Sequence, residues 1–223
     1  MKKIISILGC GWVGEALKKE LESSDTVHCL SRDMTENKEQ NKYACHTLVI
    51  AIPPRENYLE VLTLTMNEIE LSTQVIFLSS TSFYDNKEMV VKGEELIKAL
   101  DEEVLILRLS GLMGYNRIAG KYTAGKTKPH DATVNYVHRD DVLQIIKLCI
   151  EKELVNNTFN VTAPLHPKQS EIYTKNAKVF GWENTYFESD EVLGKVVSPE
   201  KLVNYLAYEF LKPNPLEFWE EIK

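Results

Sequence analysis

Short apolar runs and amphipathic segments alternate along the first half of the chain. The runs are rich in Val, Ile and Leu and have the length of strands that are buried on both faces of a parallel sheet. We expect such strands at residues 3–8, 26–30, 47–52, 74–80 and 103–109. The intervening segments carry apolar residues at helical spacing, and we expect helices at residues 12–23, 57–70 and 93–100. The alternation predicts an α/β fold with a doubly wound parallel sheet.

The pattern changes after residue 109. Residues 110–135 are rich in Gly, Lys and Tyr, so we predict that this insertion is largely loop. An amphipathic helix at 139–152 and a strand at 158–162 follow. Residues 164–223 are expected to form a small helical C-terminal lobe that, with the insertion, meets the substrate. We therefore predict one domain over residues 1–223 with this lobe attached.

Three glycines follow the first apolar run directly, in the stretch ILGCGWVGEAL. In a dinucleotide-binding turn the first glycine allows the sharp bend, the second lets the backbone approach a pyrophosphate, and the third lets the helix pack on the strand. The motif stands between a predicted strand and a predicted helix, as that role requires. The predicted cradle comprises Gly9, Gly11, Trp12, Val13 and Gly14. A plain strand-to-helix turn is the alternative.

The end of the second predicted strand should meet the adenosine ribose. Ser31 and Arg32 come first after this strand, and Asp33 follows. An Arg in this place accommodates the 2′-phosphate of NADP, whereas an acidic residue accepts a hydrogen bond from the 2′-hydroxyl of NAD. We therefore expect NADP to be preferred over NAD. In the alternative, Arg32 is a solvated loop charge and Asp33 binds the ribose.

The net charge and the cysteine spacing limit which ligands and partners the protein is expected to have. The net charge is −7 and the pI is near 5.4, which argues against nucleic acid or an anionic membrane as the main partner. Cys10, Cys29, Cys45 and Cys149 lack the spacing of a zinc site, so we expect no metal and four reduced, mostly buried thiols. The apolar N-terminal run is short and broken by glycines, so we expect no export signal, no membrane span and a cytoplasmic location.

Several motifs then occur in a characteristic order between residues 3 and 164. They are GCGWVG, LSR, IAIPP, LSSTSFYD, LRLSGLMG, VNYVHRDDV and TFNVTAP. Together they resemble the extended or atypical short-chain dehydrogenase/reductase superfamily, of the NAD(P)-dependent epimerase/dehydratase type. The resemblance implies a Rossmann fold with the dinucleotide across the carboxyl ends of the strands, where Ala51, Pro53 and Ser79 would join the cofactor pocket.

The resemblance also implies that Ser80, four residues before Tyr84, helps to hold the reacting carbonyl or hydroxyl. In the alternative, the hydroxyl residues here only satisfy loop backbone groups. The family pairs its catalytic Tyr with a Lys four residues later, but here Glu88 stands four residues after Tyr84. Three interpretations remain open. Tyr84 acts without this partner, Lys92 keeps only a ribose-holding role, or the proton chemistry has been lost.

Further polar residues stand after the fifth strand. We expect His138 to have a structural or pocket-shaping role, and Asp140 or Asp141 to cap the helix at 139–152. A group of basic and aromatic residues could meet an anionic substrate, or could be a solvated surface loop. This group comprises Tyr115, Arg117, Lys121, Tyr122, Lys126 and Lys128.

The sequence thus predicts an NADP-preferring oxidoreductase or epimerase that acts on a carbonyl or secondary alcohol of a small, anionic molecule such as a nucleotide sugar. Ser80 and Tyr84 are its candidate catalytic residues. We also expect that the chain can form a homodimer. The alternative is a binding module that senses NADP(H) without turning over a substrate, because the Tyr/Lys pair is missing while the glycines are present.

Overall fold

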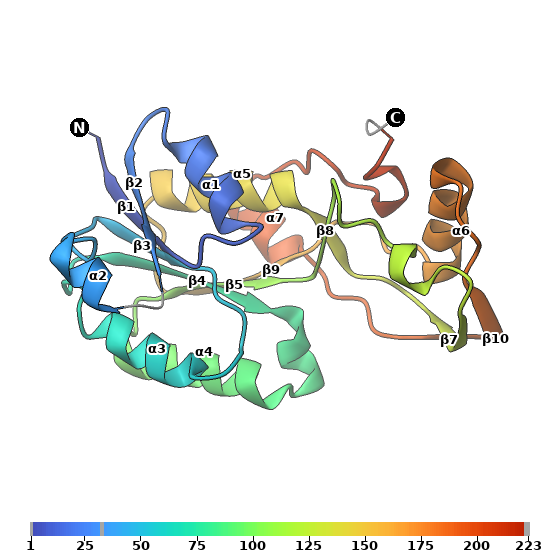
Figure 1. Ribbon diagram of the computed structural model, residues 1–223, viewed down its shortest axis with the longest axis horizontal. Helices are drawn as coiled ribbons and strands as arrows, with labels where there is room; N and C mark the ends of the chain where they lie inside the picture. Colours follow the sequence, from blue (N-terminus) through green and yellow to red (C-terminus); the bar gives the residue numbers. More distant parts are fainter. Residues whose placement is uncertain (1, 32–33, 221–223) are drawn as a thin grey trace. The chain divides into compact units, whose positions relative to one another are not determined.

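The computed structural model describes residues 2–31 and 34–220. The chain forms two compact units, Met1–Arg108 with Leu143–Phe159 and Leu109–Val142 with Asn160–Lys223. Figure 1 shows the elements of both units in sequence colours. In the described part of the chain, no helix has the length and apolar character that a membrane crossing needs.

The first unit is built on a six-stranded parallel sheet with the order β2-β1-β3-β4-β5-β9. Its strands are β1 (Ile4–Leu8), β2 (Thr26–Leu30), β3 (Thr47–Ile50), β4 (Gln74–Ser80), β5 (Leu105–Leu109) and β9 (Asn157–Val161). The strand order reverses at β1, because β2 lies on one side of it and β3 on the other. Open α/β sheets bind ligands at such a switch point, outside the carboxyl ends of the strands. The predicted fold class is confirmed.

Helices cover both faces of this sheet. They are α1 (Gly14–Leu21), α2 (Met34–Glu39), α3 (Tyr58–Met66), α4 (Glu88–Leu100) and α5 (Arg139–Glu151), with the 3-10 helix η1 (Thr81–Asp85) after β4. In Figure 1, α3 and α4 lie side by side on one face, while α1 and α5 cover the other. A hydrogen bond of 3.2 Å from Gln144 to Glu20 joins α5 to the end of α1.

The apolar runs are continuous because the strands are buried on both sides. In β3, Leu48 and Ile50 pack into the cluster that includes Tyr58 and Leu62 of α3. Val49, which points to the opposite face, is equally inaccessible. Each residue of such a strand therefore removes apolar surface from water, and a polar substitution on either face would lose that stabilisation.

The second unit holds two small parallel strand pairs and its own core. β6 (Gly111–Met113) pairs with β8 (Tyr136–His138), and β7 (Thr127–Ala132) pairs with β10 (Tyr186–Leu193). Its helices are α6 (Gln169–Phe180) and α7 (Glu200–Leu206), with the 3-10 helices η2 (Lys121–Thr123) and η3 (Pro215–Glu217). The core consists of Ala119, Val134, Ala163, Ile172, Tyr173, Phe218 and Trp219.

These strands add to two sequence predictions. Residues 110–135, predicted to be largely loop, also contain β6, η2 and β7, and residues 164–223 contain the strand β10 beside the predicted helices α6 and α7. The reason is that β7, with the sequence TKPHDA, has almost no apolar residues to signal a strand. It is held by pairing with β10, about sixty residues later, and such a pairing leaves no local pattern in the sequence.

Candidate functional site

The glycine-rich loop after β1 gives its three glycines different surroundings. Gly9 has a φ of +99°, and a β-carbon added to it would lie 2.8 Å from Cγ2 of Ile52. A β-carbon on Gly14 would lie 2.3 Å from the carbonyl oxygen of Gly9. By contrast, a β-carbon on Gly11 would have no heavy atom within 4 Å among the described residues. The fold thus requires glycine at positions 9 and 14, whereas Gly11 has open space beside its backbone.

The loop is placed by the strands around it and by the start of α1. The amide of Gly9 donates to the carbonyl of Leu30 on β2 at 3.4 Å, and the amide of Glu15 donates to the carbonyl of Gly11 at 2.8 Å. Among the described residues, no side chain caps the N-terminus of α1 at Val13. A helix N-terminus carries a partial positive charge and unpaired amides, so the open space at Gly11 fits the pyrophosphate of a dinucleotide.

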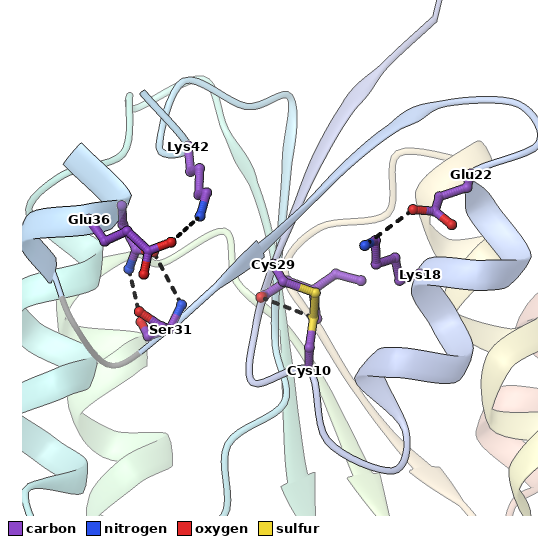
Figure 2. Close-up of a disulfide and its surroundings, with 9 residues drawn as sticks. Cys10, Lys18, Glu22, Cys29, Ser31, Glu36 and Lys42 are labelled. Carbon is purple, nitrogen blue, oxygen red and sulfur yellow. Dashed lines mark hydrogen bonds and ion pairs between the residues drawn. A yellow bond between two sulfur atoms is a disulfide. The ribbon is translucent and has the colours of Figure 1, made fainter. Parts of the chain in front are cut away.

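The same loop carries a disulfide, between Cys10 and Cys29, with a Cα–Cα distance of 5.9 Å (Figure 2). The prediction of four reduced thiols is therefore wrong for this pair, while Cys45 and Cys149 are free thiols as expected. The pairing of β1 with β2 explains the bond, because it sets Ile7 opposite Cys29 and so brings the loop that follows β1 to β2. The two cysteines are 19 positions apart, and their meeting depends on the strand register.

The backbone after β2 is held by a buried amide. The Ser31 amide donates to Oδ1 of Asn37 at 3.1 Å, and the Asn37 amide group donates to the Ser31 carbonyl at 2.8 Å. Asn37 is fully buried, whereas Ser31 is exposed at the carboxyl end of the sheet. Arg32 and Asp33, the predicted readers of the ribose, lie outside the described residues, so their roles remain predictions.

Two more predicted cofactor residues follow β3. The Ala51 amide donates to the carbonyl of Leu8 at 2.8 Å, and the Ala51 backbone lies against Gly9. Pro53 is exposed two residues later. Both residues thus follow the carboxyl end of a strand that neighbours β1, which is the edge where the resemblance expects the dinucleotide.

At the end of β4, a buried charge network stands beside the predicted catalytic segment. Ser79 donates from Oγ to Oε1 of Glu94 at 2.6 Å. Arg108 donates to both oxygens of Glu94, at 2.9 Å and 2.7 Å. The Glu94 side chain is 1% exposed and the Arg108 side chain 10%, so this ion pair is shielded from water. Ser79 thus serves to hold Glu94.

Sequence reasoning missed the Glu94–Arg108 pair, although a signal was present. Glu94 stands among the buried residues of α4, four positions after Val90 and three before Ile97, where an apolar residue is the rule. Arg108 interrupts the apolar strand β5. A charge on a buried element needs a partner, and two such charges on neighbouring elements form a candidate pair.

Arg108 also supplies a cation to the predicted catalytic segment. Its guanidinium carbon lies 3.5 Å from the ring centroid of Phe83 and 5.0 Å from that of Tyr84. Burial by itself would lower the pKa of Arg108, but hydrogen bonds to Glu94 and Tyr84 raise it, so the guanidinium stays charged. Ser80 caps η1, since its Oγ accepts a hydrogen bond from the Ser82 amide at 3.1 Å.

Lys92, predicted to hold the ribose, has another partner in this structure. Its Nζ donates to Oε1 of Glu88 at 2.5 Å, one helical turn earlier on the exposed side of α4. This hydrogen bond raises the pKa of Lys92 and lowers that of Glu88. The positive charge that lies beside the Tyr84 ring is therefore that of Arg108, from the neighbouring strand.

In the second unit, Asp141 is a structural anchor. Its carboxylate accepts hydrogen bonds from the hydroxyl of Tyr208 at 2.8 Å and from the amides of Leu211 and Lys212 at 2.7 Å and 3.1 Å. Because α5 begins at Arg139, Asp141 lies within its first turn, and the prediction that it or Asp140 caps the helix is wrong. Burial raises the pKa of Asp141, against the effect of these hydrogen bonds.

His138 and Tyr115 form a second polar cluster in this unit. His138 is buried, its Nδ1 accepts from the Asp140 amide at 3.3 Å, and its ring meets Phe218 at 5.3 Å. Tyr115 donates to the carboxylate of Asp140 at 2.8 Å, and the Arg139 guanidinium lies 4.0 Å from the Tyr115 ring centroid. The position of His138 agrees with the structural role expected for it.

The basic and aromatic group at 115–128 is partly engaged within the second unit. Lys128, on β7, donates to Oε1 of Gln169 and lies 5.7 Å from the ring centroid of Tyr173. Tyr122, in η2, is 77% exposed. Some side chains of the group therefore have partners within the unit, and others are exposed. Binding of an anionic substrate by this group remains a prediction.

A parallel sheet that reverses its order at β1, with a glycine-rich loop at that point, defines a Rossmann-type fold. No protein-family model matches the chain. Protein YeeZ of Escherichia coli is 27% identical, over 97% of this chain and 98% of that protein.

Solved structures share this fold over nearly the whole chain. A protein of Methylobacillus flagellatus, described as an NAD-dependent epimerase/dehydratase, has a TM-score of 0.82 at 20% identity, with 99% of this chain and 97% of that one covered. A human epimerase family protein with NADPH has a TM-score of 0.71 at 13% identity, with 98% of each chain covered. At these identities the likeness establishes the fold.

Proposed function

We propose that this protein binds a nicotinamide dinucleotide, with NADP preferred, and acts as an oxidoreductase or epimerase on a carbonyl or secondary alcohol. The observation that carries the proposal is the loop after β1, where Gly9 and Gly14 are closed by the fold and Gly11 borders open space. The shared fold of NAD- and NADPH-binding proteins supports it. Titration of the purified protein with NADPH tests it: saturable binding is expected, and absence of binding would refute it.

The chain's own residues would divide the work as follows. The backbone at Gly11 binds the pyrophosphate at the N-terminus of α1, in a loop that Gly9 and Gly14 shape, and Ser31 with Arg32 binds the adenosine ribose and its phosphate. The bound dinucleotide supplies hydride transfer. Ser80 orients the substrate oxygen, and Tyr84 exchanges a proton with it. Arg108, held by Glu94, keeps a positive charge beside the Tyr84 ring.

Cofactor preference is tested at Arg32. Replacement of Arg32 by Ala should weaken NADPH binding by about 10- to 100-fold, because a charged hydrogen bond to the 2′-phosphate contributes about 1.5–3 kcal/mol. NADH binding should change less than about 2-fold, since NADH lacks that phosphate. The measurement is a parallel titration of both dinucleotides against both proteins. An equal loss for NADPH and NADH would show that Arg32 does not bind the phosphate.

The proton-transfer role is tested at Tyr84. Tyr84→Phe removes the hydroxyl while keeping the ring beside Arg108, so turnover of a carbonyl substrate should fall by about 10²- to 10⁴-fold. The affinity for NADPH should stay the same. The readout is NADPH oxidation with a substrate found by screening small carbonyl compounds. Unchanged turnover would remove Tyr84 from the chemistry.

A second candidate function is a dinucleotide sensor without catalysis. The observation that favours it is that Glu88, which pairs with Lys92, stands four residues after Tyr84, where the family has its lysine. Such a protein would bind NADPH but oxidise none of it with any compound of a carbonyl panel. Turnover that depends on Tyr84 would exclude the sensor.

A further inference from the structure

The Cys10–Cys29 disulfide joins the two segments that would hold the adenosine half of a dinucleotide. Cys10 stands between the closed position Gly9 and the open position Gly11. Cys29 is the penultimate residue of β2, two residues before Ser31. Figure 2 shows the sulfur–sulfur bond running from the loop to the strand. The disulfide therefore lies beside the positions proposed for the pyrophosphate and the adenosine ribose.

One noncovalent contact between the same two segments is weak. The hydrogen bond from the Gly9 amide to the Leu30 carbonyl is 3.4 Å long, beyond the usual range for an amide donor. The disulfide therefore adds a strong constraint at a point where this backbone hydrogen bond gives a weak one. Loss of the bond would leave the loop, and with it the open surface at Gly11, freer to move.

The chain could exchange this disulfide selectively. Cys10 and Cys29 are both partly exposed residues, whereas Cys149 is buried. The other two cysteines react poorly, because burial raises the pKa of Cys149 to about 12 and also raises the pKa of Cys45. A thiolate, and not a thiol, is the reactive species. The covalent state of the loop can thus change while the remaining thiols stay unmodified.

We propose that Cys10 and Cys29 form a thiol–disulfide exchange site that sets the affinity of the adjacent glycine-rich loop for a nicotinamide dinucleotide. This inference rests on the dinucleotide binding proposed above. In the disulfide form the loop is already held in the conformation that leaves Gly11 open. Binding of the dinucleotide then costs little conformational entropy of the loop. The dithiol form must order the loop when the dinucleotide binds, and this entropy cost lowers its affinity.

The exchange uses a dithiol as reductant. One of its thiolates attacks a sulfur of the pair, forms a mixed disulfide and releases the other cysteine as a thiolate. The second thiolate of the reductant then displaces the remaining cysteine sulfur and closes a cyclic disulfide. The two protons lost by the reductant are regained by Cys10 and Cys29. One disulfide is consumed and one is formed, and a disulfide of the same class reverses the step.

The test compares the full-length protein with and without dithiothreitol. Thiol counting should show two free thiols before reduction and four after it, from the four cysteines of the chain. The dissociation constant for NADPH should rise by about 5- to 10-fold on reduction. Cys29→Ser should bind like the reduced protein and ignore dithiothreitol, while the control Cys45→Ser should respond like the unaltered chain.

Three other outcomes overturn the proposal, each in a distinct way. Equal affinities before and after reduction, within about 2-fold, would refute the coupling and leave dinucleotide binding intact. Tighter binding by the reduced protein would show that the disulfide obstructs the loop. If neither form binds NADPH, the proposed function fails and the coupling with it. If Cys29→Ser does not fold, the test rests on the NADPH dissociation constants of the oxidised and reduced forms of the unaltered chain.

Discussion

Replacement of Gly11 by Val should weaken NADPH binding at least about 100-fold, or about 2.8 kcal/mol, without unfolding the protein. The branched side chain would fill the open space beside the loop, which is where the pyrophosphate must approach the backbone. The melting temperature should change by no more than about 4 °C, because a β-carbon at Gly11 has no heavy atom within 4 Å among the described residues. Fluorescence titration and thermal unfolding measure the two effects.

Gly14 provides the matched control for this variant. A methyl group on Gly14 would lie 2.3 Å from the Gly9 carbonyl oxygen, so Gly14→Ala should cost about 1–3 kcal/mol of unfolding free energy. The two variants thus distinguish the open position at Gly11 from the packed position at Gly14. Undiminished NADPH binding by Gly11→Val would show that the glycines only make a turn.

Replacement of Arg108 by Met should lower the free energy of unfolding by about 3–5 kcal/mol. Among the described residues, the change leaves the buried Glu94 carboxylate with the Ser79 hydroxyl as its hydrogen-bond partner. An unpaired charge in that environment is far more costly than the loss of one contact. Urea denaturation measures the effect through the transition midpoint, provided the slope is unchanged.

The double variant Glu94→Met with Arg108→Met should recover more than half of that loss, since two apolar side chains of similar size can replace a buried pair. Lys18→Met breaks an exposed pair with Glu22 and should change stability by no more than about 1 kcal/mol. A single Arg108 variant that loses less than about 1 kcal/mol would show that the pair is not needed for the fold.

The sheet of the first unit could be predicted because its signals are local. β1, β3 and β4 are apolar along most of their length, and the glycines after β1 mark both the turn and the helix that follows. The candidate cradle residues Gly9, Gly11 and Gly14 were identified for the same reason. The surroundings of Gly9 could not be predicted, because they depend on Ile52 and Ala51, which follow another strand.

What the sequence did not show depends on contacts between distant segments. β7 is polar and exists through its pairing with β10. Cys10 meets Cys29 through the register of β1 with β2, and Asp141 finds its partners about seventy residues later, at Tyr208 to Lys212. In each case the residue type is visible in the sequence, but the partner follows only from the tertiary arrangement.

The most direct test of the central claim is a titration of the purified protein with NADPH and, separately, with NADH. We expect saturable binding of both, followed by nicotinamide fluorescence, with the tighter binding for NADPH. NADPH at 100 times its dissociation constant should also stabilise the protein by about 2.7 kcal/mol, visible as a higher melting temperature. Absence of binding by either dinucleotide, with the melting temperature unchanged, would contradict the account and leave the glycine loop as a turn.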